Sequence, residues 1–218
     1  MRQVLTRLNA LTDSQRAVWW WALVLGILSY QVAKGHLAGF DQVMASWVGV
    51  LRSPWLDMPV RAITFFGSSL WMLVALGGLG CLAWRRGGLQ TVLILLGTVA
   101  VSLVLEVLLR YSVSSWRPDT VGVSEDLEWF ARFRLAGYPS GHAFRSALVF
   151  GWLMRVLRSH RQRWAAVVRT ACLVMIGLVG FTRLYLNRHW ASDVVGSWLV
   201  VLVAMAIGRC WEEAQARA

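Results

Sequence analysis

The sequence predicts an all-α, polytopic membrane protein with six transmembrane helices and an interfacial amphipathic helix between the first two spans. Of its 218 residues, 57% are hydrophobic and only 15% are charged, whereas a soluble domain carries about 25% charged residues. The apolar residues gather in long runs. Most of these runs have a length close to the ~20 residues that a helix needs to cross a bilayer. The 14 tryptophans fit the same class, because Trp favours membrane interfaces.

We expect a single transmembrane domain over residues 1–218, because this length suits one compact unit and no internal repeat is evident. The net charge is +11, and Lys34 is the only lysine among 22 basic residues. A basic chain is also typical of nucleic-acid binding, but here the arginines fall mostly between the apolar runs. We therefore predict no nucleic-acid partner and attribute the charge to membrane topology and phosphate binding. The sequence leaves the oligomeric state open.

The first apolar run covers Ala17–Val32 and follows a basic segment, so a cleaved signal peptide is the competing interpretation. No convincing small-x-small cleavage site follows it, which favours a retained helix. Five further runs complete the predicted spans: Ala62–Trp84, Leu89–Leu109, Ser140–Leu157, Ala165–Tyr185 and Trp190–Ile207.

A shorter apolar stripe lies between the first two runs. Its members recur at helical spacing: Phe40, Val43, Met44, Trp47, Val48 and Leu51. This pattern is typical of an amphipathic helix. Such a helix lies flat in the membrane interface or packs as a short core helix, and the pattern alone does not separate the two.

Six spans place both termini on the same side of the membrane. Arginines gather on that side at Arg2, Arg7, Arg16, Arg85-Arg86, Arg155–Arg169, Arg209 and Arg217. The positive-inside rule makes this side cytoplasmic. We therefore expect an integral protein of a bacterial inner membrane, with the other face toward the periplasm or the extracellular side.

Three polar stretches lie at the ends of the apolar runs. They are Arg110 with Arg117-Pro118, then Pro139–His142, then Arg183 with His189 and Asp193. Polar residues at membrane depth are costly and are by default functional candidates. With six spans, all three stretches reach the outer face, although a chance set would be divided between the two faces about as often as not.

The residue types in these stretches suit a phosphoryl group. Arg110, Arg117 and Arg183 each present a planar fork of donors that pairs with phosphate oxygens. Ser140 and Gly141 lie where a helix is predicted to begin, and free backbone N–H groups there favour an anion. Gly141 also removes a side chain where phosphate must approach closely.

The histidines and the carboxylate suit nucleophilic catalysis. His189 and Asp193 are four residues apart and therefore share a helix face. Asp193 can accept a hydrogen bond from one ring nitrogen, which fixes the tautomer and leaves the other nitrogen free to attack phosphorus. His142 is then the candidate general acid that protonates the leaving alkoxide.

At these residues the chain resembles the type-2 phosphatidic acid phosphatase (PAP2) family of membrane phosphatases. The family pattern is Lys-x6-Arg-Pro, then Pro-Ser-Gly-His, then Ser-Arg-x5-His-x3-Asp. The sequence reads Arg110-x6-Arg117-Pro118, Pro139-Ser140-Gly141-His142 and Thr182-Arg183-x5-His189-x3-Asp193. Arg110 replaces the family's Lys, a change that either favours a different phosphate pose, such as a diphosphate, or is simply tolerated. Thr182 replaces Ser and keeps the hydroxyl.

The resemblance implies hydrolysis of a lipid phosphate in two steps, without a metal or other cofactor. His189 attacks to form a phosphohistidine, His142 protonates the leaving oxygen, and water then releases phosphate. The implied phosphate ligands are Arg110, Arg117, Ser140, Gly141 and Arg183. The substrate classes known in the family are phosphatidylglycerophosphate, phosphatidic acid, polyprenyl diphosphates such as undecaprenyl diphosphate, and phosphorylated lipid A.

Several alternatives remain open from the sequence. The same site could pass the phosphoryl group to another lipid, or the Arg and His residues could form the anion path of a transporter. Glu106, one helical turn before Arg110, is expected to pair with it, the alternative being a proton relay. The acidic and aromatic loop Tyr111–Tyr138 is either a lid over the substrate entrance or an interfacial loop.

Overall fold

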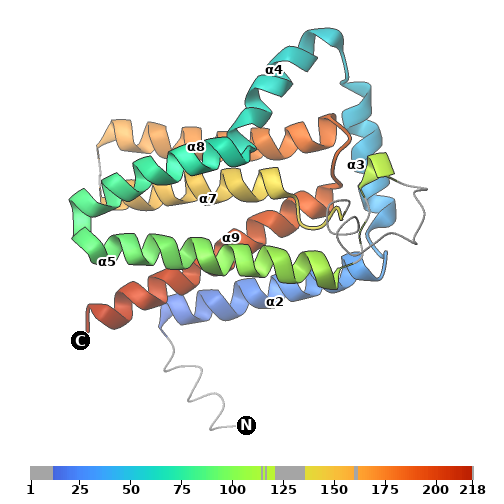
Figure 1. The fold of residues 1–218 in the computed structure, drawn as a ribbon. Helices are drawn as coiled ribbons and strands as arrows, with labels where there is room; N and C mark the ends of the chain where they lie inside the picture. The colour runs from blue at the N-terminus through green and yellow to red at the C-terminus, as the bar shows by residue number, and fades with distance from the viewer. Residues whose placement is uncertain (1–11, 114, 116, 121–135, 160–161, 218) are drawn as a thin grey trace, which may run out of the picture.

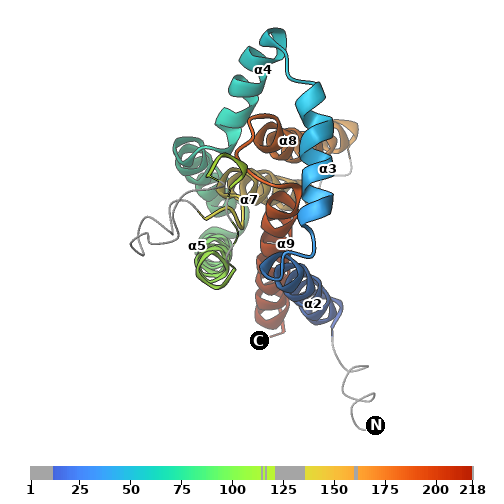
Figure 2. The ribbon, with the colours of Figure 1, turned by 90° about the vertical axis from the view of Figure 1, so that its right-hand side faces the viewer.

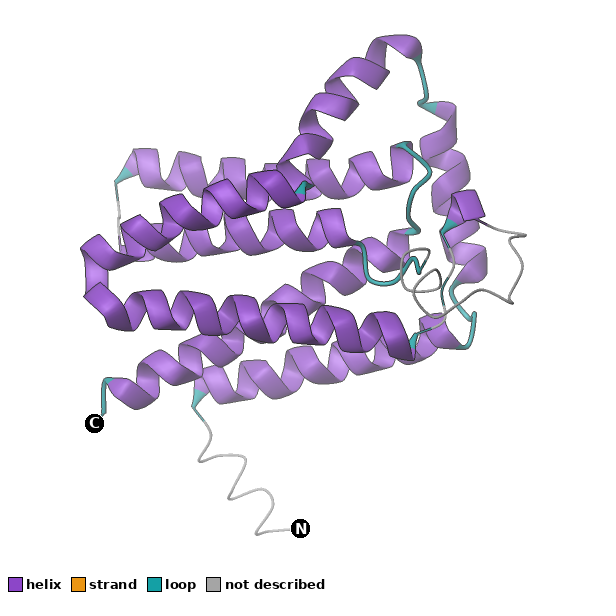
Figure 3. Ribbon diagram, in the orientation of Figure 1, coloured by secondary structure: helices purple, strands orange, loops and turns teal. Residues whose placement is uncertain are grey.

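The computed structural model describes residues 12–113, 115, 117–120, 136–159 and 162–217. Every regular element in these ranges is a helix (Figure 3). The predicted all-α fold class is therefore confirmed. Besides the long helices, the described chain contains three short 3-10 turns, Phe65–Gly67, Pro118–Thr120 and Leu157–Ser159.

The long helices run side by side along one direction and form a bundle (Figure 1). They are α2 (Asp13–Ala33), α5 (Ser69–Ser112), α7 (Gly141–Val156), α8 (Arg163–Tyr185) and α9 (Ala191–Gln215). Helix α5 folds back on itself at Gly87-Gly88, where the backbone leaves helical geometry and Gly88 has φ +61°. Glycine tolerates this left-handed conformation, so the predicted turn between two spans is present. The two arms of α5 and the other four helices give the bundle six helical segments.

Three of these helices are long and apolar enough to cross a membrane, namely α5, α8 and α9. Because α5 folds back, it contributes two of the six segments. Helix α7 has 16 residues, fewer than the about 20 that a full crossing needs, and most of its side chains are buried by its neighbours. The protein is an integral membrane protein, while the count of six spans stays a prediction.

Helix α9 lies at the centre of the bundle, with 72% of its most apolar stretch buried against 28% for α5 and α8. The core beside it is built from α7, whose Phe144, Leu148 and Trp152 are fully buried. Glycine lets α8 approach α9 closely: a Cβ atom at Gly180 would lie 2.7 Å from Trp198 Cζ2 and 2.8 Å from Val194 Cγ1. This central position fixes both ends of α9 relative to the other helices.

Two helices that are not part of the bundle follow α2. Helix α3 (Ala38–Val50) runs across the end of the bundle, and α4 (Pro54–Thr64) returns toward the start of α5 (Figure 2). The sequence prediction missed α4, because it began the second span at Ala62 whereas α5 begins at Ser69. Pro54 in the first turn favours a helix start, but the apolar run continues through Phe65 and Phe66 and hides the break before Ser69.

Most of the apolar stripe of α3 faces away from the bundle, while Met44 and Val48 of the same stripe pack against the protein. Phe40, Val43 and Trp47 are 53%, 51% and 70% exposed, whereas Asp41 and Val48 are buried against the protein. A core helix would bury these apolar side chains instead. The arrangement favours the interfacial interpretation, in which this face contacts lipid.

The close approach of α8 and α9 can be tested with two glycines on α8. Gly180→Ala is expected to lower the melting temperature of the purified protein, because overpacking a core contact costs about 1–3 kcal/mol of unfolding free energy. Gly177 lies less than one turn away with open space around its Cα, so Gly177→Ala should leave the melting temperature unchanged or raise it slightly. Equal melting temperatures for the two variants would contradict the close packing.

Candidate active site

The three polar stretches meet at one end of the bundle. There α5 and α8 end, and α7 and α9 begin, at the end opposite the glycine turn of α5 (Figure 1). The structure therefore brings the predicted site residues together from four helical segments. Their proposed chemical roles remain predictions.

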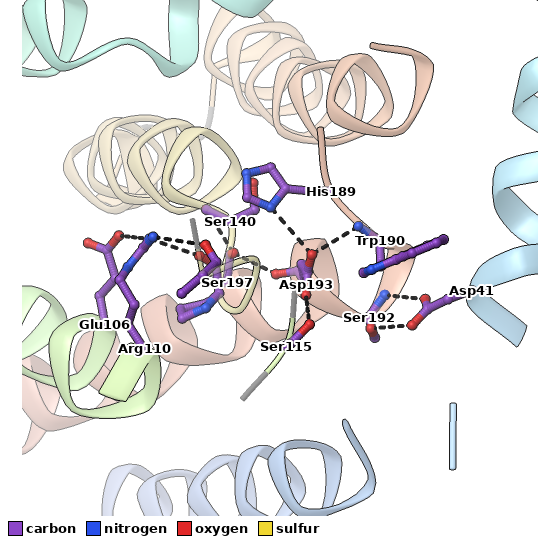
Figure 4. Close-up of polar contacts among 12 residues, drawn as sticks. Asp41, Glu106, Arg110, Ser115, Ser140, His189, Trp190, Ser192, Asp193 and Ser197 are labelled. Carbon is purple, nitrogen blue, oxygen red and sulfur yellow. Dashed lines mark hydrogen bonds and ion pairs between the residues drawn. The ribbon is translucent and has the colours of Figure 1, made fainter. Parts of the chain in front are cut away.

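His189 and Asp193 lie at the start of α9 and are both buried, with exposed fractions of 5% and 0%. His189 Nδ1 lies 3.3 Å from Asp193 Oδ2. The same carboxylate accepts hydrogen bonds from the Trp190 N–H at 2.9 Å and from the Ser115 hydroxyl at 3.4 Å (Figure 4). The short connection from α8 passes through Asn187, whose φ of +55° suits Asn better than most residues.

The surroundings of His189 keep its imidazole neutral. Burial is the main cause that lowers the pKa of His189 well below 6.5, and the positive charges of Arg183, Arg117 and Arg110 lower this pKa further. All three arginines of the predicted phosphate site therefore act electrostatically on this one ring. A neutral imidazole whose Nδ1 faces Asp193 has Nε2 available as a nucleophile.

Ser140 is the N-cap residue of α7 and is fully buried. Its N–H donates to the Asp193 carbonyl oxygen at 3.2 Å, which joins the starts of α7 and α9. Within the described part of the chain, its Oγ has no hydrogen-bond partner. A buried hydroxyl without a partner is costly, so an oxygen atom of a bound phosphate would satisfy it.

Gly141 and Gly67 allow close contacts around the start of α7. A Cβ atom at Gly141 would lie 3.2 Å from the Arg145 guanidinium and 3.4 Å from Glu106 Oε1. A Cβ atom at Gly67 would lie 2.8 Å from His142 Cβ. The segment after α4 therefore packs directly on the candidate general acid.

Arg110 is held by several contacts at the end of α5. Its Nη2 donates to Glu106 Oε1 at 2.9 Å and to the Pro139 carbonyl oxygen at 3.0 Å, while Nη1 donates to the Ala136 carbonyl oxygen at 3.3 Å (Figure 4). The predicted pair with Glu106 is confirmed. These contacts also give Arg110 a structural role, because they hold the segment that leads into Ser140.

The other two arginines approach from different sides. Arg183, at the end of α8, is 8% exposed and donates from Nη1 to Thr64 Oγ1 at 3.0 Å. Its Nε is a buried donor without a partner among the described residues. Arg117 lies in the connection after α5, where burial and then the charge of Arg110 lower its pKa. Crowded positive charges of this kind are stabilised by an anion.

Several residues of this region were missed by sequence reasoning. Ser197 donates to the Ser140 carbonyl at 2.9 Å and to the Asp193 carbonyl at 2.8 Å, and its position four residues after Asp193 was a usable signal. The hydroxyl groups of Tyr138 and of Ser29 in α2 form a hydrogen bond at 2.9 Å. Further missed contacts are Thr64 to Arg183, Ser115 to Asp193 and Asp41 to Ser192.

The structure leaves the predicted lid and the predicted absence of a metal untested. Most of the loop Tyr111–Tyr138 falls outside the described residues, so neither interpretation of it is tested; Asp119, which is described, pairs with Arg188 at 2.5 Å. In the described ranges, no group of three or more His, Cys, Asp and Glu side chains is placed to hold a metal ion. Metal independence remains a prediction.

Comparison with known proteins gives consistent matches over most of the chain. The model of the PAP2 superfamily matches residues 91–216. Phosphatidylglycerophosphatase B of Bacillus subtilis (strain 168) is 24% identical over 194 residues, which cover 86% of this chain and 90% of that protein.

Two solved structures have a similar fold. A transmembrane PAP2 type phosphatidylglycerolphosphate phosphatase from Bacillus subtilis superposes with a TM-score of 0.73 at 21% identity, covering 90% of this chain and 96% of that one. LpxE from Aquifex aeolicus gives a TM-score of 0.59 at 20% identity, covering 78% and 94%.

The helical bundle and the residues at its end define an integral-membrane lipid phosphatase. The family match covers more than half of the chain, so the chain belongs to the PAP2 superfamily.

The identity of residue 110 can be tested by two substitutions. Arg110→Lys is expected to keep substantial phosphate release from a lipid phosphate, because lysine retains the charge beside Glu106. Arg110→Ala should lower kcat/KM at least about 100-fold, through loss of a charged donor and of the brace on the segment before Ser140. The far-end variant Arg85→Ala is the control and should be unchanged. Equal losses in both Arg110 variants would instead require the planar guanidinium itself.

Proposed function

We propose that this protein hydrolyses a lipid phosphate without a metal ion, through a phosphohistidine formed on His189. One observation carries the proposal: a buried, neutral imidazole is oriented by Asp193 and acted on by three arginines from three separate stretches of the chain. A nucleophile held by a carboxylate and surrounded by fixed positive charge suits attack on a phosphoryl group.

In the first step, His189 Nε2 attacks phosphorus and the bond from phosphorus to the leaving oxygen breaks. His142 gives its proton to that oxygen, which leaves as the alcohol of the lipid. The positive charges of Arg183 and Arg145 oppose a proton on His142. The anionic phosphate of a bound substrate would offset these charges and favour the proton that this step requires. Asp193 stabilises the positive charge that develops on His189.

In the second step, water attacks the phosphohistidine and the bond between phosphorus and nitrogen breaks. His142 now acts as the base and takes a proton from the attacking water. Orthophosphate leaves, and His189 returns to its neutral form. Throughout both steps the proposed clamp consists of Arg110, Arg117, Arg183, the Ser140 hydroxyl and the N–H of Gly141.

The proposed substrate is a phosphomonoester lipid whose tails remain in the bilayer, with phosphatidylglycerophosphate as the first candidate. The Bacillus subtilis relative and the Bacillus subtilis solved structure both carry that activity in their names. Phosphatidic acid, polyprenyl diphosphate and phosphorylated lipid A are the further candidates. From the distribution of arginines we place the site on the periplasmic face of the inner membrane.

Chelation and one substitution test the mechanism together. Phosphate release from phosphatidylglycerophosphate in detergent should survive excess EDTA, since no step uses a metal. His189→Ala should lower kcat at least about 10⁴-fold, the scale on which loss of a nucleophile acts. His36 is exposed in the turn after α2, so His36→Ala is the matched control. Inactivation by EDTA, or normal turnover in His189→Ala, would overturn the mechanism.

The same preparation separates the two competing functions. A phosphotransferase would move labelled phosphate to a second lipid and release little orthophosphate. A transporter would move the lipid across vesicle membranes without releasing phosphate, and its His189→Ala variant would still do so. Acid-labile, base-stable labelling of wild-type protein that disappears in His189→Ala would instead support the phosphohistidine.

The pH dependence follows from the lowered pKa of His189. The neutral ring is the nucleophile, so activity is present above this pKa and is lost as pH falls through it. The acid limb of kcat/KM should therefore have its midpoint below pH 6.5. The second ionisation of the substrate phosphate, near pH 6, is measured separately by phosphorus NMR. A midpoint above 6.5 would contradict the neutral, buried nucleophile.

A further inference from the structure

A cavity lies between α7, α8 and α9 and extends from the middle of the bundle toward the end opposite the active site. Its volume is about 600 Å³, within the range of about 300–1,000 Å³ that ligand sites occupy. The apolar part of its lining includes Ala147, Gly151, Leu173, Ile176, Val201 and Leu202. Leu173 and Leu202 remain partly exposed on the outside of the bundle, where lipid chains would lie.

The cavity is separate from the catalytic centre. Along α9, Arg209 follows Asp193 by 16 residues, a rise of about 24 Å. The cavity is lined on α9 by residues from Trp198 to Arg209 and on α8 by residues from Arg169 to Ile176, whereas the active site is built at the start of α9 and the end of α8. A single headgroup bound at His189 cannot also occupy this cavity.

The cavity has a basic rim. Arg155, Arg158, Arg169 and Arg209 line it. Two of them are engaged: Arg155 pairs with Glu212 at 2.6 Å, and Arg169 donates to the Leu157 carbonyl at 3.1 Å. Glu212 is the carboxylate paired at this rim, so the four arginines leave a positive excess.

Two buried donors at the cavity wall point to a polar ligand group. In the described part of the chain, Arg209 Nε and Trp198 Nε1 are buried and have no hydrogen-bond partner, and both residues line the cavity. Unsatisfied buried donors cost free energy, and an acceptor beside Arg209 Nε would remove that cost there. Trp198 lies 11 residues earlier on α9, about 16 Å away along the helix axis, so its Nε1 would need a separate acceptor deeper in the cavity.

We infer that this cavity binds an anionic phospholipid from the leaflet opposite the active site. Its phosphate lies against Arg158 and Arg209, and one acyl chain fills the apolar part beside Gly151. The charge of the rim selects an anionic headgroup, and basic pockets between transmembrane helices bind such headgroups. The inference does not depend on the reaction at His189.

Native mass spectrometry of the purified chain tests this inference. The probe is dioleoyl phosphatidylserine, a phosphodiester that offers no terminal phosphate, with dioleoyl phosphatidylcholine as the zwitterionic comparison of zero net charge. Wild-type protein should retain phosphatidylserine in preference to phosphatidylcholine. Arg158→Gln/Arg209→Gln should weaken its binding about 25-fold, since each arginine near a bilayer surface contributes about fivefold. The control Arg85→Gln/Arg217→Gln removes two exposed arginines outside the cavity and should bind as wild type does.

A second pair of variants tests the apolar part while keeping every charge. Gly151 has room for a side chain, because a Cβ atom there would meet only Val201 Cγ1, at 4.0 Å. Gly151→Leu should therefore fill the cavity and weaken phosphatidylserine binding. Gly177→Leu, on the exposed side of α8, should not. Wild-type binding in both cavity variants would overturn the inference. Binding that is lost instead in Arg183→Gln would place the lipid in the active site and overturn it as well.

Discussion

The buried carboxylate of Asp193 is the contact on which the active end of the molecule depends. Its oxygens hold His189, the Trp190 N–H and Ser115, while its backbone carbonyl receives the Ser140 N–H and the Ser197 hydroxyl. One residue therefore orients the nucleophile, caps the start of α9 and fixes the start of α7. A charged group buried away from water is tolerated only when it is hydrogen-bonded. The central place of α9 in the bundle makes that possible.

The second constraint is the concentration of positive charge at the site. Arg110 and Arg183 differ in the partners that their guanidinium groups have. Arg110 pairs with Glu106 and also donates to backbone carbonyl oxygens before Ser140. Arg183 has a hydroxyl partner, Thr64, and a buried Nε without one among the described residues. Arg110 therefore also shapes the segment before Ser140, whereas Arg183 keeps a buried donor that a ligand could satisfy. A phosphate group would satisfy both the guanidinium and the Ser140 hydroxyl.

The parts that sequence predicted well are those set by local spacing. Four-residue separations place His189 beside Asp193 and Glu106 beside Arg110, and the order of apolar runs brings their ends together. The contact between Thr64 and Arg183 could not be predicted from the sequence. It depends on α4, and the continuous apolar run concealed that helix. The cavity near Arg209 was equally hidden, since it depends on how three helices separate in space. Such long-range contacts leave no periodic signal in one sequence.

The unequal lengths of the helices explain how a polar site serves a membrane substrate. Helix α7 has 16 residues against 23 in α8 and 25 in α9, and it begins short of the neighbouring ends (Figure 1). Ser140, the N-cap residue of α7, is therefore recessed within the bundle and fully buried. A lipid can then present its phosphate to His189 while its tails stay in hydrocarbon, so binding avoids most of the free-energy cost of leaving the bilayer. The short helix, which has too few residues for a full crossing, is what places its N-terminus inside the bundle beside the start of α9.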